Sequence, residues 1–238
     1  MPNLNDLKKR IASVKSTQKI TKAMKMVAAA KLRKAQEAAE QSRPYSDNMK
    51  NLMDSISRGF ISTDNSRNLL TGNDEDKTYL LVLFTSERGL CGGFNSQISK
   101  ALREKVVELQ KQDKVVKIIC VGKKGYDIVK RQYGNIIVDT VDLSAIKSIQ
   151  YNDAKNISDK IIKMYFDAEF DKCLIFYNKF KSVISQIPTE QQVVPAEIGE
   201  QKNEEDAIED NNFFEFEPNE KEILEELLPL NFAVQIFK

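Results

Sequence analysis

The chain has 238 residues, 41% of them apolar and 30% charged, which allows one large hydrophobic core or two small ones and excludes a mainly disordered protein. Histidine is absent, so Ser-His-Asp and Cys-His catalysis and a zinc site of ordinary spacing are excluded. The three cysteines (Cys91, Cys120 and Cys173) lie far apart, which argues against a disulfide framework and fits a reducing compartment. No apolar run approaches the roughly 18 residues of a membrane span, and residues 1–9 lack the apolar core of a signal peptide, which favours a bacterial cytoplasmic protein or a mature form already trimmed.

The first predicted element is one long helix over residues 4–56, which contain no glycine and a single proline, Pro44. An unbroken helix of that length would extend roughly 80 Å, which is typical of a coiled coil or a shaft that leaves its domain. We expect Pro44 to kink the helix without ending it. At its start the apolar side chains alternate by three and four residues, the spacing at which a partner helix packs: Leu4, Leu7, Ile11 and Val14.

Every charged residue between Leu7 and Gln36 on this predicted helix is basic. A solvated helix normally mixes both signs, so two interpretations stay open: a basic solvated face, or a surface that faces nucleic acid, lipid or an acidic protein. The net charge of +1 also hides a second bias, because residues 197–226 carry thirteen acidic residues and two lysines. Between Leu7 and Gln36 there are ten basic residues and no acidic one: Lys8, Lys9, Arg10, Lys15, Lys19, Lys22, Lys25, Lys31, Arg33 and Lys34.

A predicted loop over residues 62–77 leads into a region where strands alternate with helices. Such alternation predicts βαβ units with a mainly parallel sheet, that is, a doubly wound α/β domain beside the long helix. The predicted strands are residues 79–84, 115–121, 136–138 and 173–177, and the predicted helices are residues 98–109, 126–132 and 154–170. Residues 183–194 predict one or two edge strands limited by Pro188, and residues 213–216 are a candidate for a last strand.

A glycine-rich stretch, residues 86–95 (SERGLCGGFN), follows the first predicted strand directly. Such turns bind phosphates in many α/β folds. The spacing here is Gly-x-x-Gly-Gly, however, whereas a dinucleotide site needs G-x-G-x-x-G and a Walker loop needs G-x-x-x-x-G-K-[ST]. A tight turn that packs against a neighbouring element is therefore favoured over a nucleotide site.

Two long stretches together carry a resemblance to a known family. Residues 11–33 (IASVKSTQKITKAMKMVAAAKLR) and residues 86–95, in this order, resemble the γ subunit of the F-type ATP synthase. The similarity covers essentially the whole chain. It includes Arg43-Pro44-Tyr45, Asn178-Lys179-Phe180 and Gln186-Ile187-Pro188-Thr189.

The resemblance implies a rotary, non-catalytic role. In that family the N-terminal helix pairs with a C-terminal helix as an antiparallel coiled coil inside the alpha3beta3 ring, and the α/β domain forms a foot on the epsilon subunit and the c-ring. Rotation couples proton translocation to ATP synthesis or hydrolysis in the beta subunits. For this chain the resemblance implies no cofactor, no metal, no nucleic acid and no small-molecule substrate, and a peripheral place on the cytoplasmic side of the bacterial inner membrane.

The resemblance also implies a division of the chain into four parts. Residues 1–60 would form the shaft helix, residues 61–77 a linker, residues 78–217 the Rossmann-like foot and residues 218–238 the start of the C-terminal helix. Family members continue for several dozen residues beyond the match to residues 232–238, so we expect the C-terminal helix to be truncated in this sequence.

Five residues are carried over as contacts with the alpha3beta3 ring. Met24, with its basic neighbours Lys22 and Lys25, matches the part of the shaft that runs against an acidic lever segment of the beta subunit. Cys91 matches a turn residue near the same lever, and Arg88 beside it would pair with that acidic segment.

Two other classes of function stay open from the residues alone. A Rossmann-type enzyme with its site at the glycine-rich turn would bind ATP or NAD tightly as an isolated chain. A basic coiled-coil module would bind duplex DNA or anionic vesicles with an affinity that falls steeply with salt, but it leaves the α/β domain unexplained.

Overall fold

The computed structural model describes residues 3–59, 68–73, 75–146, 148–196 and 220–237. By its internal contacts the chain forms two compact units, Met1–Asn48 and Met49–Phe237. The acidic residues 197–219 and the candidate strand 213–216 lie outside the described residues. No helix within those ranges has both the length and the apolar character needed to cross a lipid bilayer.

Helix α1, Leu4–Gly59, is a single α-helix of 56 residues. The prediction that it continues through Pro44 is confirmed. Lysine and alanine, both strong helix formers, are the most frequent residues of its first half. Its last turns belong to the second unit, where Met49 and Met53 are buried in the hydrophobic core.

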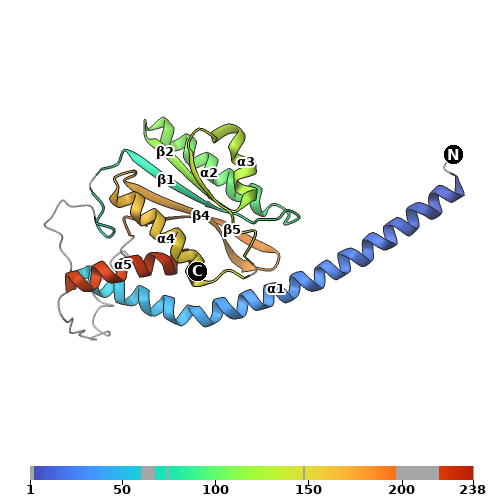
Figure 1. The fold of residues 1–238 in the computed structure, drawn as a ribbon, viewed down its shortest axis with the longest axis horizontal. Coiled ribbons are helices and arrows are strands. Elements are labelled where there is room, and N and C mark those ends of the chain that lie inside the picture. Colours follow the sequence, from blue (N-terminus) through green and yellow to red (C-terminus); the bar gives the residue numbers. More distant parts are fainter. Residues whose placement is uncertain (1–2, 60–67, 74, 147, 197–219, 238) are drawn as a thin grey trace. The chain divides into compact units, whose positions relative to one another are not determined.

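The second unit is built on a five-stranded sheet in the order β3-β2-β1-β4-β5 (Figure 1). The strands are β1 Thr78–Phe84, β2 Val115–Val121, β3 Ile137–Val141, β4 Lys172–Ser182 and β5 Ser185–Val194. The first four strands are parallel, and β5 pairs antiparallel with β4 at the edge. The predicted mainly parallel, doubly wound sheet is therefore confirmed.

Helices cover both faces of this sheet (Figure 1). Helices α2 (Phe94–Lys111) and α3 (Lys123–Tyr133) pack on one face, and α4 (Tyr151–Phe166) and α5 (Glu220–Phe237) pack on the other. Strand β1 is buried on both sides: Leu81 and Leu83 face α2 and α3, whereas Leu80 and Val82 face the opposite core. This double burial explains why its sequence is continuously apolar and does not alternate.

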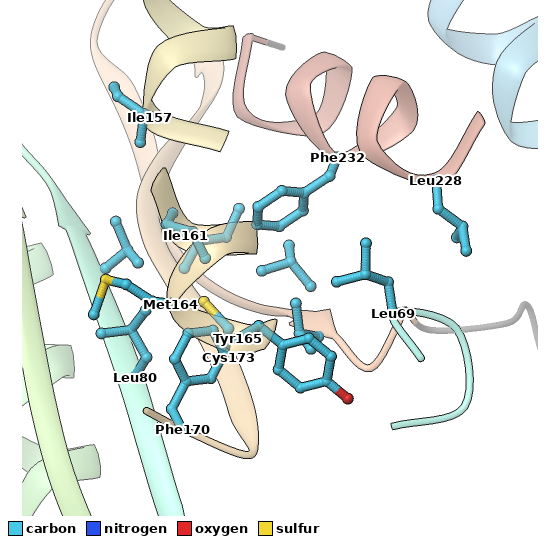
Figure 2. Close-up of a cluster of buried hydrophobic side chains, with 14 of the residues drawn as sticks. Leu69, Leu80, Ile157, Ile161, Met164, Tyr165, Phe170, Cys173, Leu228 and Phe232 are labelled. Carbon is cyan, nitrogen blue, oxygen red and sulfur yellow. The ribbon is translucent and has the colours of Figure 1, made fainter. Parts of the chain in front are cut away.

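The core under α4 and α5 is shown in Figure 2. Phe232 of α5 points toward Ile161 of α4, and Tyr165 and Phe170 pack beneath them with ring centroids 5.6 Å apart. All four side chains are buried. This packing fixes α5 against α4 on the sheet.

The boundaries of several elements differ from the predicted ones. The helix predicted over residues 154–170 ends at Phe166, because Ala168 adopts a left-handed conformation with φ +59°. Helix α2 begins at Phe94, four residues earlier than predicted. Strand β4 continues to Ser182, five residues beyond the predicted end, and forms a hairpin with β5.

The turn between β2 and α3 is packed closely against the end of β1. A Cβ at Gly122 would lie 2.3 Å from the carbonyl oxygen of Thr85, and the φ of Gly122 is +99°. The Thr85 hydroxyl accepts a hydrogen bond from the Gly125 N–H at 2.8 Å. Only glycine fits at position 122 without moving the backbone.

We expect Gly122→Ala to lower the free energy of unfolding by about 3 kcal/mol, because it adds both steric overlap and backbone strain. Urea titration followed by circular dichroism measures this change. The matched control is Gly89→Ala, where a Cβ meets no atom within 4 Å, and it should change the value by no more than about 0.5 kcal/mol. Equal effects of the two substitutions would contradict the packing argument.

A charged network joins the amino ends of three adjacent strands. The Asp76 carboxylate accepts a hydrogen bond from the Tyr79 hydroxyl and lies 3.0 Å from the ammonium groups of Lys114 and Lys172. The Tyr79 hydrogen bond, followed by the two lysines, holds the pKa of Asp76 well below its usual range. Burial, together with Asp76, raises the pKa of Tyr79 to about 12.

Because the pKa of Asp76 is lower in the folded state, its ionised form contributes stability above the unfolded pKa, near 4, and this contribution is lost as pH falls through the folded pKa. Urea titrations between pH 7 and pH 2 should therefore show a smaller loss of stability for Asp76→Asn than for the unsubstituted chain. Asp159→Asn, at an exposed position of α4, is the control and should keep the original pH dependence. An Asp76→Asn curve parallel to the original would refute the role of this carboxylate.

Candidate functional site

The loop between β1 and α2, residues 85–93, lies at the carboxyl edge of the sheet where the winding direction changes. From β1 the chain proceeds to β2 on one side, whereas β4, on the other side of β1, is reached later through α4. In open α/β sheets this switch point is where functional loops gather. The glycine-rich stretch is therefore placed at the edge most often used for recognition.

Asn95, in the first turn of α2, determines the shape of this loop. Its carboxamide oxygen accepts a hydrogen bond from the Ser86 N–H at 3.0 Å. Its amide nitrogen donates to the Ser86 hydroxyl at 2.8 Å and to the Cys91 sulfur at 3.2 Å. The polar side chains of the loop are thus used to hold its own conformation.

Glu87 fixes the loop to its neighbours. Its carboxylate accepts hydrogen bonds from the backbone N–H groups of Lys123 at 3.1 Å and Leu143 at 2.8 Å. These groups follow β2 and β3, so one carboxylate connects the carboxyl ends of three strands. The Glu87 carboxylate is therefore already hydrogen-bonded to backbone N–H groups, whereas the cationic side chain of Arg88 beside it is exposed.

The tip of the loop, residues 90–92, is exposed to solvent. Leu90 is 96% exposed and has a φ of +64°, and Gly92 has a φ of +59°. Gly93 precedes α2 as its N-cap and makes no side-chain cap bond. Arg88, Leu90 and Cys91 together form an exposed surface that combines a cation, an apolar side chain and a thiol.

The other three predicted site residues lie in the first unit, on α1. Lys22 and Lys25 are about 60° apart around the helix and share one face. Met24, 52% exposed, belongs to the stripe of Ile20 and Val27, which lies on the opposite side of the helix. The structure thus brings Lys22 and Lys25 together on α1 and Arg88 and Cys91 together in one loop of the second unit.

All ten cations of the basic stretch on α1 are exposed. Where the structure describes this stretch, the recorded ion pair is Arg33 Nε with Glu37 Oε1 at 2.9 Å, outside the Lys22–Lys25 face. The apolar seam is exposed as well: Leu4, Leu7, Ile11, Val14, Ile20, Met24 and Val27. This helix therefore exposes both its apolar side chains and its cations to solvent.

Two features of the second unit were not predicted from the sequence. Asn95 closes the loop, a role that an asparagine at the start of a helix after a glycine turn can indicate. The exposed end of the β4–β5 hairpin is the other, although residues 178–189 contain no acidic residue.

Comparison with known proteins gives consistent results. A family model described as ATP synthase matches residues 3–238. The ATP synthase gamma chains of Sinorhizobium medicae and Pelagibacter ubique are each 53% identical to this chain over 238 residues, covering all of it and 80% of the relative. A chain in the central stalk and c-ring structure of Tetrahymena thermophila mitochondrial ATP synthase has a similar fold, with a TM-score of 0.66, 22% identity, and coverage of 92% of this chain and 89% of that one.

The three cysteines differ in accessibility. Cys91 is exposed, whereas Cys120 and Cys173 are buried in β2 and β4. Burial raises the pKa of Cys120 to about 12 and that of Cys173 well above its usual range, which suppresses their thiolates.

We therefore expect Ellman's reagent to titrate one thiol rapidly in the native chain, and Cys91→Ser to abolish that rapid phase. In denaturant all three thiols should react, which provides the internal control. A second rapid thiol in the native chain would show that a central strand is more open than described.

Proposed function

The chain belongs to the family of ATP synthase gamma chains, and on this premise we propose that it is the rotary central-stalk subunit of an F-type ATP synthase. In this role it couples proton translocation through the c-ring to conformational cycling and ATP synthesis or hydrolysis in the alpha3beta3 head. The observation that carries the proposal is the character of α1. It is one continuous helix with an exposed apolar seam and ten exposed cations in its first 36 residues.

The seam of α1 is suited to a partner helix. The apolar side chains of its start, Leu4, Leu7, Ile11 and Val14, recur at spacings of three and four residues and remain exposed. A helix with such a stripe gains most of its stability by burying it against another element. We assign this role to a C-terminal helix that pairs antiparallel with α1, as the family implies.

We assign Lys22, Met24 and Lys25 on α1, and Arg88 and Cys91 in the second unit, to contact with the acidic lever segments of the beta subunits. All five are exposed. A screened pair between exposed charges contributes only about 0 to 1 kcal/mol. Such weak contacts suit a rotor, because each must form and release as it passes three equivalent partners.

The gamma chain itself is proposed to be non-catalytic, with nucleotide chemistry in the beta subunits. In support, the chain has no histidine, and the polar side chains of its glycine-rich loop bond to one another. Among the described residues no cluster of cysteine and carboxylate side chains is arranged to hold a metal ion. Family membership does not favour the Rossmann-type enzyme or the nucleic-acid module.

We propose that residues 1–60 act as the shaft, 61–77 as a linker, 78–217 as the foot and 218–238 as the start of the C-terminal helix. The foot would rest on the epsilon subunit and the c-ring. Its place would be peripheral, on the cytoplasmic side of the inner membrane, which the bacterial origin of the similar gamma chains supports.

The double change Lys22→Glu and Lys25→Glu tests the lever contact. In the assembled complex it should lower ATP-driven proton pumping several-fold, because two attractive pairs become repulsive, while leaving assembly and helix content unchanged. Pumping is measured by acridine-dye quenching in membrane vesicles. Lys155→Glu with Lys163→Glu, two exposed lysines of α4, is the charge-matched control and should preserve pumping. Unaltered coupling in the Lys22/Lys25 variant would refute the lever contact.

A further inference from the structure

The segment between α1 and β1 contains a compact turn, residues 68–73, which we call the strap. The backbone N–H groups of Asn68 and Gly72 each donate to the carbonyl oxygen of the other, at 3.2 Å and 2.8 Å. The Asn68 side-chain oxygen also accepts a hydrogen bond from the Leu70 N–H at 2.8 Å. Both Leu69 and Leu70 are buried. A segment that only connected two elements would be exposed and variable in shape, so this closed and buried turn needs another explanation.

Two hydrogen bonds hold the first half of the strap to the rest of the second unit. The Tyr165 hydroxyl of α4 donates to the carbonyl oxygen of Asn68 at 3.1 Å. The N–H of Ala196, directly after β5, donates to the carbonyl oxygen of Leu69 at 2.9 Å. Figure 2 shows the Tyr165 hydroxyl directed toward the segment that carries Leu69. The strap is thus attached to a helix and to a strand.

A buried carboxylate holds the end of the strap. The Asn73 side-chain amide donates to the carboxylate of Asp171, directly before β4, at 3.0 Å. The same carboxylate accepts the backbone N–H groups of Lys77 at 3.1 Å and Thr78 at 2.9 Å. Asp171 is buried, so water competes little for these bonds. The strap is therefore fixed at the amino edge of the sheet, where β1 and β4 begin and β5 ends.

The leucines of the strap meet both helices that we assign to the shaft. Leu69 and Leu70 belong to one buried cluster with Met49 and Met53, in the last turns of α1. Figure 2 shows Leu69 facing α5. Leu69 lines a small cavity together with side chains of β5 and α5 and the residue after β5: Val193, Ala196, Leu228, Asn231, Phe232 and Gln235.

Apolar contacts alone resist sliding poorly. Hydrophobic attraction has no direction, so a buried side chain can shift along an apolar surface at little cost while it stays buried. A hydrogen bond weakens steeply when its angle or length changes, and it therefore opposes such a shift. A helix that must transmit a turning force to a sheet needs contacts of the second kind. The strap combines the two, because hydrogen bonds fix its backbone and its leucines enter the apolar cluster.

We propose that the strap is the fastening through which torque passes between the foot and the two shaft helices. Tyr165, Asn73 and Asp171 are positioning residues that keep Leu69 and Leu70 in place against α5 and the end of α1. This inference rests on the proposed function, because torque is carried only in an assembled rotor. It goes beyond that function by giving part of the proposed linker, residues 61–77, a mechanical task.

Tyr165→Phe with Asn73→Ala tests the proposal in the assembled, membrane-bound complex. This variant removes two of the hydrogen bonds and keeps both leucines of the strap. We expect the ratio of proton pumping to ATP hydrolysis to fall about twofold while hydrolysis is undiminished, because the shaft then yields against the foot under load. Pumping is measured by acridine-dye quenching and hydrolysis by phosphate release, in the same membrane vesicles.

Hydrogen exchange measures the fastening itself. Because the Ala196 N–H donates to the strap, its exchange rate reports how often the strap opens. We expect this rate to rise about tenfold in the Tyr165/Asn73 variant, followed by mass spectrometry of the purified complex. Exchange in β1, which is wholly buried from Leu80 to Leu83, should not change. A general loss of stability would instead accelerate exchange in β1 and lower the amount of assembled complex.

The matched control is Tyr177→Phe with Asn156→Ala. It removes the same two chemical groups away from the strap, since the Tyr177 hydroxyl donates to Gln191 in the β4–β5 hairpin at 3.1 Å and Asn156 is exposed on α4. Both the pumping ratio and the Ala196 exchange rate should stay at their original values. Leu69→Ala, which keeps the backbone bonds of the strap and removes the side chain that faces α5, should lower the pumping ratio about threefold.

The outcomes separate this inference from the proposed function. An unchanged pumping ratio in the Tyr165/Asn73 variant overturns the torque role alone, and so does an unchanged exchange rate at Ala196. Equal losses in the control variant, or failure of the Tyr165/Asn73 variant to assemble, would make these groups general folding elements and overturn it as well. Absence of the unsubstituted chain from the purified complex overturns the proposed function and this inference with it.

Discussion

The burial of β1 on both faces is the constraint on which the second unit depends. Leu80, Leu81, Val82 and Leu83 are wholly buried, which places β1 at the centre of the sheet with a core on each side. The loop that follows it must therefore emerge at the middle of the carboxyl edge. There Thr85 meets Gly122 and Gly125, and Glu87 bonds to the backbone after β2 and β3. A loop positioned by so many backbone contacts is pre-organised, which would reduce the entropy lost in the contact proposed for it.

In the first unit, the side chains of helix α1 are mostly exposed, in contrast to the buried side chains of β1. Its apolar side chains and its cations both face solvent, so the interactions that stabilise it in use come from other chains or other helices. The physical chemistry of a rotor agrees with this arrangement. An apolar seam holds a permanent partner, whereas exposed charges make contacts that salt and water weaken and that reverse easily.

The sequence predicted the central strands well because their signal is local. Continuous apolar runs of strand length, such as residues 79–84 and 173–177, are typical of strands buried on both faces. The end of α4 could not be predicted, since nothing local indicates that Ala168 adopts a positive φ. The extension of β4 past Tyr177 was missed because Lys179 and Lys181 interrupt the apolar pattern there. Lys22, Met24, Lys25, Arg88 and Cys91 came from resemblance to a family, and their contacts with partner chains stay a prediction.

Both borders of the sheet are unsuited to recruiting a further strand. At one border β5 carries Pro188, which has no N–H to offer and breaks the row of backbone donors. At the other border β3 has only five residues, and its Asp139 is paired with Lys160. Short strands, prolines and charges at such borders oppose edge-to-edge aggregation. Copies of this chain that have not yet assembled with other subunits therefore have little tendency to polymerise through the edges of their sheets.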